Sequence, residues 1–297
     1  MKTYYGFKEL NKKSAVAIGA FDGIHLGHQE IIKRTVEIAG KNNLISVLIT
    51  FDPDPEEVIK NKKRILLTNL EKKLDLVKSL GIEKVIILPF NAEFMRMTAE
   101  DFIDKIIKYI DPKWIIIGKG FRFGYDQKGD HSFLKTMGDK YSFQAEEVSL
   151  LSFGGEIISS TKIRKHLING EIEKAEKLLG YPYKVRGKVV KGKGVGKETG
   201  FPTANLKVDS RLAVPAKGVY SGFIKFNKKE KKCAIYIGTS PTMKINEFQI
   251  EAHIPGEDID LLKKEVTLVF KKRIREEKTF KNTEELTKQI TSDLKKI

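Results

Sequence analysis

Short apolar runs alternate with amphipathic stretches through residues 1–181, and this alternation limits the fold more than any other feature of the chain. Short apolar runs bounded by turn residues are typical of buried strands, whereas apolar residues spaced three or four apart are typical of helices. The expected strands are Ala15–Ile18, Ile45–Thr50, Val85–Leu88, Trp114–Ile117 and Phe143–Val148. The expected helices are Gln29–Ala39, Asn69–Leu80, Ala99–Tyr109 and His131–Met137. The pattern predicts a parallel α/β sheet, whose ligands bind at the carboxyl ends of the strands.

The alternation stops near Gly180-Tyr-Pro-Tyr183, where glycine and proline interrupt the helical pattern of Thr161–Ile168 and Ile172–Leu179. Strands separated by turns follow, with one terminal helix, Thr283–Lys295. These strands are expected at Val185–Val190, Val219–Phe226, Lys232–Ile237, Phe248–His253 and Val266–Phe270. They predict a small antiparallel barrel. We therefore expect two domains, residues 1–181 and residues 182–297.

Composition restricts the class of protein. The 297 residues are 40% hydrophobic and 32% charged, as in globular proteins, and no apolar run is long enough to cross a membrane. The net charge of +16 permits a nucleic-acid partner, but the lysines are scattered and many face glutamates at helical spacing. Residues 1–8 lack the apolar core of a signal peptide, and the single Cys233 excludes an intrachain disulfide, so we expect a cytoplasmic protein.

The loop after the first expected strand reads Ile18-Gly-Ala-Phe-Asp-Gly-Ile-His-Leu-Gly-His28. It brings His25 and His28 to the start of a helix, where unpaired N–H groups and the helix dipole attract anions. Three glycines let the backbone approach a ligand closely: Gly19, Gly23 and Gly27. The loop therefore predicts a phosphate site.

Two other interpretations of the histidine pair stay open. The rings could be structural, or they could bind zinc together with further cysteine, histidine or carboxylate ligands. The chain has three other histidines that could contribute: His131, His166 and His253.

A second cluster, Ser159-Ser-Thr-Lys-Ile-Arg164, also opens an expected helix. Its hydroxyls could simply cap the helix, but capping does not explain Lys162 and Arg164 in the same turn. Hydroxyls beside a lysine and an arginine are typical of a triphosphate clamp. Together, the two clusters indicate that the chain binds a nucleotide.

The first cluster, Gly-x-Phe-Asp-Gly-x-His-x-Gly-His, resembles the nucleotidylyltransferase signature, in the form found in bacterial bifunctional riboflavin kinase/FMN adenylyltransferases, the FAD synthetases. The second resembles the second nucleotide motif of the same family. The resemblance implies a Rossmann-like N-terminal domain that adenylylates FMN, with His25, His28 and Arg164 as catalytic groups. It implies that ATP is bound by Gly19, Phe21, Asp22, Gly23, Gly27, Ser160 and Thr161.

Two segments between these clusters also resemble family motifs. Thr50-Phe-Asp-Pro-Asp-Pro55 is similar to Phe-Asp-Pro-His-Pro, with Asp54 where histidine is usual, and Gly118–Gly124 is similar to Val-Gly-x-Asp/Asn-Phe-x-Phe-Gly, with Gly120 where Asp or Asn is usual. The alternative for the phenylalanines is core packing. The resemblance implies a flavin site formed by Phe51, Phe121, Arg122 and Phe123.

In the second domain, Lys193–Asn205 resembles the riboflavin kinase signature Gly-x-x-x-Gly-Phe-Pro-Thr-Ala-Asn. Thr203 and Asn205 would point to one face of a strand, where they could hold Mg²⁺ and the phosphates of ATP. The resemblance implies that Glu251 is the catalytic base. It implies two glycines at ATP and one flavin-site arginine: Gly194, Gly196 and Arg275.

The chain departs from the family pattern at four positions of this domain: Tyr236, Ser240, Leu262 and Lys263. We expect a bifunctional enzyme that converts riboflavin to FMN and FMN to FAD with MgATP. The alternatives are a monofunctional FMN adenylyltransferase with an impaired kinase barrel, and a basic nucleic-acid-binding protein with a transferase-like fold. The expected partners are small molecules only, with no nucleic acid and no membrane, and the expected state is a monomer or weak homo-oligomer.

Overall fold

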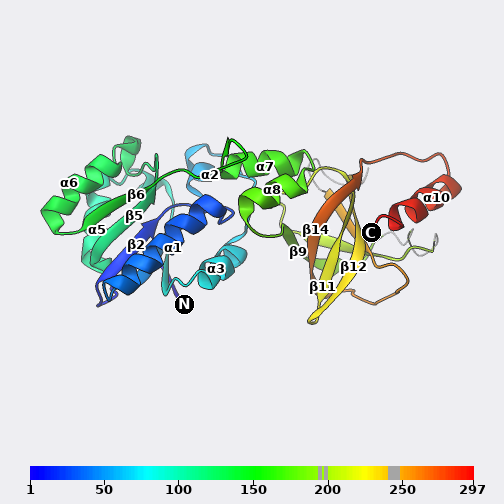
Figure 1. Ribbon diagram of the computed structural model, residues 1–297, viewed down its shortest axis with the longest axis horizontal. Coiled ribbons are helices and arrows are strands. Elements are labelled where there is room, and N and C mark those ends of the chain that lie inside the picture. Colours follow the sequence, from blue (N-terminus) through cyan, green and yellow to red (C-terminus); the bar gives the residue numbers. More distant parts are fainter. Residues whose placement is uncertain (193–195, 197–199, 240–247) are drawn as a thin grey trace. The chain divides into compact units, whose positions relative to one another are not determined.

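The computed structural model describes residues 1–192, 196, 200–239 and 248–297 (Figure 1). The chain divides into two compact units, Met1–Ser160 and Thr161–Ile297. The predicted boundary lies at residue 181, whereas this division falls at the start of two helices, Ser160–Ile168 and Ile172–Leu179, and places them with the second unit. The boundary at residue 181 stays a prediction.

The first unit contains a six-stranded parallel sheet in the order β1-β4-β3-β2-β5-β6. Its strands are β1 (Lys2–Tyr5), β2 (Ser14–Ile18), β3 (Ile45–Asp52), β4 (Lys84–Pro89), β5 (Pro112–Gly118) and β6 (Gln144–Val148). Its helices are α1 (Leu26–Lys41), α2 (Pro55–Ile59), α3 (Leu70–Ser79), α4 (Ala92–Met95), α5 (Ala99–Ile110), the short 3₁₀ helix η1 (Tyr125–Gln127) and α6 (His131–Tyr141). A hairpin of β7 (Ser152–Phe153) and β8 (Glu156–Ile157) ends the unit.

Side chains of β2 alternate between the two faces of this sheet, as the pleat of a strand requires. Ala15 and Ala17 pack with residues of α1 and α3, whereas Val16 and Ile18 pack with residues of α5 and α6. Both faces are thus covered by helices, which explains why the central strands are apolar throughout.

The strand order reverses at β2, which pairs with β3 on one side and with β5 on the other. In parallel α/β sheets such a reversal opens a crevice at the carboxyl ends of the two strands. Two of the loops singled out by the sequence leave the sheet here, residues 19–25 after β2 and residues 119–130 after β5. The fold therefore places the histidine loop at the edge where ligands bind.

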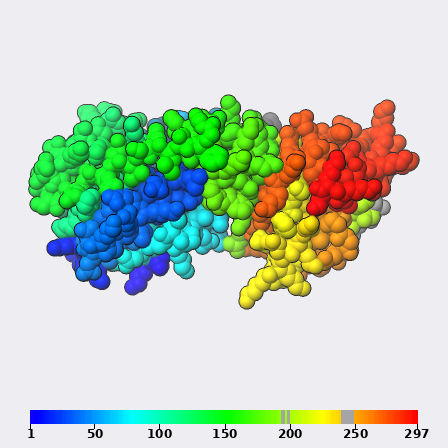
Figure 2. All heavy atoms as spheres, in the orientation of Figure 1, coloured from blue at the N-terminus to red at the C-terminus, as the bar shows by residue number. Residues whose placement is uncertain are grey.

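The second unit is a closed antiparallel barrel with strand order β10-β13-β12-β11-β14-β9. Its strands are β9 (Lys184–Val190), β10 (Thr203–Val208), β11 (Gly218–Phe226), β12 (Lys229–Thr239), β13 (Phe248–His253) and β14 (Glu265–Arg275). Its helices are α7, which begins at the division between the units (Ser160–Ile168), α8 (Ile172–Leu179) and α10 (Thr283–Leu294). Figure 2 shows α10, coloured red, on the surface of this unit.

The predicted fold class is confirmed: a parallel sheet with helices, then an antiparallel barrel with a terminal helix. The strand pattern did not predict β1, β10 or the β7–β8 hairpin, because all three are short or polar. None of the described helices is both long and apolar enough to cross a membrane.

Candidate active sites

The loop between β2 and α1 is folded by backbone conformations that few residues adopt. Phe21, Gly23 and Ile24 have φ angles of 52°, 84° and 37°. At Gly23 a Cβ atom would lie 2.7 Å from the Leu67 side chain, so the tight turn requires glycine. The ring of Phe21 is buried under the loop and does not project from it. This turn points the start of α1 toward the crevice.

His25 and His28 stack on each other at the start of α1, with ring centroids 3.6 Å apart and planes 15° apart. Nδ1 of His25 accepts a hydrogen bond from the backbone N–H of His28, which caps the helix and leaves the ring proton on Nε2. A Cβ at Gly27 would lie 3.3 Å from the His25 ring, so this glycine also makes room for the stack. The structure thus brings together the two histidines that the sequence predicted to act together.

His28 is the more unusual of the two. Burial lowers the pKa of His28 well below 6.5, and the nearby charges of His25 and Lys73 lower it further. Its Nδ1 atom is buried and has no hydrogen-bond partner among the described residues. A buried, unsatisfied ring nitrogen costs folding free energy, which is typical of a group kept for a ligand.

Asp22 has a role within the loop itself. Its carboxylate accepts hydrogen bonds from the backbone N–H groups of Leu67 and Thr68, at 2.9 and 3.2 Å, in the segment before α3. Its carbonyl oxygen accepts a hydrogen bond of 2.8 Å from the hydroxyl of Ser160. These contacts tie three segments together beneath the histidine pair. The predicted contact between Asp22 and ATP stays a prediction.

Lys73 is a residue of this site that the sequence analysis missed. Its side chain is buried, and Nζ donates to the carbonyl oxygen of Ala20 at 2.7 Å and to the Thr50 hydroxyl at 3.3 Å. Burial lowers the pKa of Lys73, and the carboxylates of Asp22 and Asp54 oppose that shift. The signal was available: Lys73 lies four residues before Val77 on the apolar face of α3, where a lysine needs an explanation.

Ser160, Thr161 and Arg164 occupy the first turns of α7. Thr161 is exposed and Arg164 is half-buried. An exposed hydroxyl and a cation at the start of a helix suit a phosphate, because the first N–H groups of the helix point the same way. This local arrangement agrees with the predicted clamp, whose contact with ATP stays a prediction.

A cavity of about 670 Å³ opens at the carboxyl ends of β3, β4 and β5. Ala20 of the histidine loop borders it, together with six phenylalanines and three other apolar side chains: Phe51, Phe90, Phe94, Phe102, Phe121, Phe123, Met95, Met97 and Ile59. The rings of Phe121 and Phe123 stack with centroids 5.8 Å apart. Its size and aromatic walls suit a flat ligand such as a flavin ring.

All four residues predicted for the flavin site border this cavity, namely Phe51, Phe121, Arg122 and Phe123. Gly120 does not border it. The φ angle of Gly120 is +80°, and no atom lies within 4 Å of the position that a Cβ would take. The family usually has Asp or Asn at this position, whereas this chain has a glycine in an exposed turn. Arg122 pairs with Asp130 at 2.8 Å, which holds the guanidinium at the cavity.

In the barrel, strand pairing brings the predicted kinase residues into two adjacent rows. Asn205 of β10 lies opposite Glu251 of β13, which in turn lies opposite Tyr236 of β12. Two residues before Asn205 on β10, and therefore on the same face, Thr203 lies opposite His253. Residues directly opposite each other on paired strands share a face of the sheet. The pairing therefore collects these side chains on one face.

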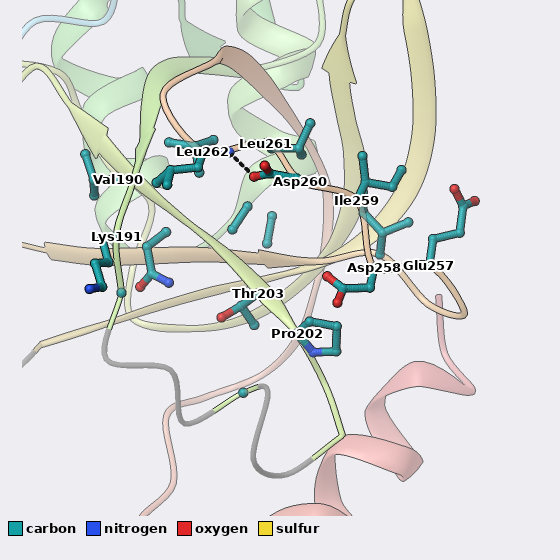
Figure 3. Close-up of a pocket in the computed structure, with 17 residues that line it drawn as sticks. Val190, Lys191, Pro202, Thr203, Glu257, Asp258, Ile259, Asp260, Leu261 and Leu262 are labelled. Atoms are coloured by element: carbon teal, nitrogen blue, oxygen red, sulfur yellow. Dashed lines mark hydrogen bonds between the residues drawn. The ribbon is translucent and has the colours of Figure 1, made fainter.

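Two cavities meet at these rows, with volumes of about 430 and 360 Å³. Both are bordered by Gly196, Thr203 and Asn205. In the first cavity, Figure 3 shows Lys191 at the left, Thr203 in the lower middle, Asp258 to the right of Thr203, and Asp260, Leu261 and Leu262 above them. Leu262 departs from the family pattern, and Lys263, a second departure, follows it. Both side chains are exposed.

The second cavity contains Glu251, Tyr236 and Arg275, and apolar side chains of α10 close it: Leu286, Ile290 and Leu294. Arg275 donates to the buried carboxylate of Asp293 on α10 at 2.7 Å, so the predicted flavin-site arginine also holds this helix. Tyr236 replaces the family's asparagine. Its ring lies over Gly238, and its hydroxyl donates to Glu277 at 2.7 Å.

The residues fit a magnesium ion where the two cavities meet. Thr203 and Asn205 point to one face, and a Cβ at Gly192 would lie 2.2 Å from Asn205 Nδ2, so the backbone passes close to the polar pair. Magnesium takes few protein ligands and the rest from phosphates and water, so two such oxygens suffice. The described residues contain no cluster of three or more histidine, cysteine or carboxylate side chains that could hold a metal on their own. Gly194 and Ser240 lie outside the described residues.

Comparison with known proteins shows the family to which the chain belongs. A family model described as FAD synthetase matches residues 7–162, and one described as riboflavin kinase matches residues 179–297. Three similar proteins bear the name bifunctional riboflavin kinase/FMN adenylyltransferase. That of Buchnera aphidicola subsp. Schizaphis graminum is 38% identical over 98% of this chain and 95% of its own. That of Escherichia coli is 34% identical over 94% of this chain and 90% of its own. That of Bacillus subtilis is 34% identical over 96% of this chain and 92% of its own.

A crystal structure from Streptococcus pneumoniae, described as a macrolide-efflux protein, has a TM-score of 0.88 and 28% sequence identity, over 99% of this chain and 98% of that one. The fold and the two sites therefore define a two-domain transferase acting on nucleotides and flavins. More specifically, the chain belongs to the family of bifunctional riboflavin kinase/FMN adenylyltransferases, which make FMN and FAD.

Proposed function

We propose that the barrel phosphorylates riboflavin to FMN and that the α/β unit adenylylates FMN to FAD, each with MgATP. The observation that carries the proposal is the pair of cavities, one in each unit: Ala20 of the histidine loop borders the first, and Thr203 and Asn205 border the second. A nucleic-acid-binding protein would need neither cavity. The supporting residues come from the same segments that the sequence singled out.

In the adenylyl transfer, a phosphate oxygen of FMN attacks the α-phosphorus of ATP, a new P–O–P bond forms, and pyrophosphate leaves. The attacking phosphate is already an anion at neutral pH, so the site needs alignment and charge stabilisation rather than a general base. We assign charge stabilisation to His25, His28 and Arg164, with Ser160 and Thr161 on the ATP phosphates. The loop from Gly19 to Gly27 supplies backbone N–H groups to the same nucleotide, and Phe51, Phe121, Arg122 and Phe123 hold the flavin.

In the kinase reaction, the 5′-hydroxyl of riboflavin attacks the γ-phosphorus of ATP and ADP leaves. A hydroxyl is a poor nucleophile, so a base must accept its proton, and we assign this role to Glu251. Bound Mg²⁺ would supply charge neutralisation at the phosphates, and Thr203 with Asn205 would hold it. Gly194 and Gly196 would let the backbone cover the phosphates, and Arg275 would contact the flavin. Of the departures from the family pattern, Tyr236 and Leu262 border the two cavities of this site.

Location and assembly complete the proposal. Cys233, the single cysteine, is buried inside the barrel, and burial raises the pKa of its thiol to about 12, so it stays reduced and unreactive in a cytoplasmic environment. We propose that the protein acts in the cytoplasm on riboflavin, FMN and ATP alone. We also propose that it works as a monomer or weak homo-oligomer.

Chromatographic analysis of the products tests the proposal. The full chain is incubated with MgATP and either riboflavin or FMN. We expect riboflavin to give FMN and then FAD, and FMN to give FAD directly. Conversion of FMN without conversion of riboflavin would leave only the adenylyl transfer, and the absence of both products would reject the proposal.

A further inference from the structure

One wall of the cavity in the α/β unit is formed by charged residues of α2 and the segments beside it. We call it the α2 wall and define it as Asp54, Glu56, Lys60 and Arg64. The side chain of Asp54 is 6% exposed and that of Arg64 is 20% exposed. Two charged groups so well shielded from water need partners that fix their positions.

The contacts within the α2 wall fix the direction of both groups. Arg64 Nη1 lies 2.7 Å from Asp54 Oδ1, and Arg64 Nη2 lies 2.7 Å from Glu56 Oε2. Asp54 Oδ1 also accepts the backbone N–H of Glu56 at 3.0 Å, which caps α2. In the described part of the chain, Asp54 Oδ2 has no such contact, so it remains an acceptor. Each terminal nitrogen of Arg64 carries a second N–H, which remains a donor.

The charge of the α2 wall argues against phosphate as its ligand. Its two carboxylates, Asp54 and Glu56, are offset by its two cations, Arg64 and Lys60, and Lys60 pairs with Glu56. A wall with balanced charge has no excess attraction for an anion. It can instead form hydrogen bonds with the edge of a neutral polar ring, because Asp54 Oδ2 is an acceptor and the N–H groups of Arg64 beside it are donors.

We propose that Asp54 and Arg64 read the pyrimidine edge of the flavin ring in the adenylyl-transfer site. This inference rests on the proposed function of the cavity. The edge presents a carbonyl, the N3–H group and a second carbonyl. Asp54 Oδ2 accepts the N3–H, and Arg64 donates to a neighbouring carbonyl, while the phenylalanine rings pack on the faces of the ring system. The pair is thus a specificity determinant, distinct from the groups that handle phosphate.

An FMN analogue methylated at N3 tests this assignment, because the methyl group removes the one donor of the edge. With the wild-type chain and saturating MgATP, we expect kcat/KM for FAD formation to be about 30-fold lower for the analogue than for FMN, since an unpaired buried acceptor is costly. With Asp54→Ala, we expect FMN to be used about tenfold less well and the ratio between the two substrates to shrink to about threefold.

Two further variants complete the design. Asp54→Asn keeps the cap of α2, since asparagine and aspartate cap equally well, and removes the charge; we expect a ratio between those of the wild type and Asp54→Ala. Asp126→Ala removes another carboxylate that borders the same cavity, and we expect the wild-type ratio. The fluorescence of Trp114, the only tryptophan of the chain, reports whether each variant has folded.

The outcomes separate the inference from the function on which it rests. If both Asp54 variants keep the wild-type ratio, Asp54 does not read N3 and the inference is overturned. If the wild-type chain does not convert FMN at all, the proposed adenylyl transfer itself fails. A ratio that shrinks at Asp54 and not at Asp126 supports the inference.

Discussion

The α/β unit holds its histidine pair on a loop and at the start of α1, whereas the barrel holds its proposed kinase residues on paired strands. In the first unit, the position of His28 depends on left-handed backbone at three neighbouring residues and on a buried lysine beneath the turn. In the second, Glu251 and Asn205 face each other because two strands pair in one register. The difference teaches that the same task, holding ATP beside a flavin, can depend on turn geometry or on strand register. The first arrangement should be sensitive to changes beneath the loop, and the second to changes on the face itself.

The largest effect is expected at the histidine pair. His28→Ala removes the ring to which we assign charge stabilisation of the ATP phosphates, so FAD formation from FMN should fall about 1,000-fold. Riboflavin phosphorylation should change less than about twofold, because its groups lie in the barrel. Initial rates of both reactions on the same preparation measure this, with His131→Ala as the control. Equal loss of both activities would break the proposed separation of the two sites.

The reverse pattern is expected from the barrel. Glu251→Gln keeps the size of the side chain and removes the base, so FMN formation from riboflavin should fall about 100-fold while FAD formation from FMN is retained. Glu230→Gln, an exposed carboxylate on β12 of the same barrel, serves as the matched control. An unchanged kinase rate in the Glu251 variant would remove this residue as the base.

A smaller effect is expected beneath the loop. Lys73→Met leaves the carbonyl of Ala20 without its buried donor, so FAD formation should fall about 30-fold through misplacement of the histidine pair. Lys78→Met changes an exposed lysine of the same helix and should leave the rate unchanged. Full activity in Lys73→Met would show that the turn keeps its shape without this support, which would weaken the contrast between the two units.

The smallest effect concerns stability and pH. The pKa of His28 is lower in the folded chain than the ordinary value of 6.5, so the unfolded chain binds the extra proton first as the pH falls. The first unit should therefore lose stability below about pH 6.5, by at most about 1.4 kcal/mol per pH unit. Denaturant unfolding followed by Trp114 fluorescence measures this. His28→Gln, which does not titrate, should give a shallower dependence, and an equal slope would assign the effect to other groups.

Much of the fold of both units could be predicted from the sequence. Strands such as β2 are apolar throughout, and helices such as α5 have apolar residues at helical spacing. The histidine loop was also predictable, because its glycines and histidines lie in one continuous segment, from Gly19 to His28. Strand β10 was not among the strands expected from apolar periodicity, because Thr203–Val208 mixes polar and apolar residues. Only the kinase motif placed Thr203 and Asn205 on a strand, and the neighbours in the barrel define its full extent.

Side chains that act across long sequence separations were harder to foresee. Lys73 reaches Ala20 across 53 positions, and Tyr236 reaches Glu277 across 41. Arg64 was missed for a different reason. It lies only ten positions from Asp54, but nothing in a local pattern shows that the chain turns back between them to form a pair in a cavity wall. Such contacts depend on the tertiary fold rather than on local propensity.

The border that the two barrel cavities share has a consequence for how their occupants affect each other. Thr203 and Asn205 form part of the wall of both chambers, so a molecule seated in one chamber alters the surface that the other molecule meets. Thermodynamic reciprocity then requires that whatever factor the nucleotide imposes on flavin affinity, the flavin imposes on nucleotide affinity. Each occupant of the barrel is, in this sense, part of the other's binding site.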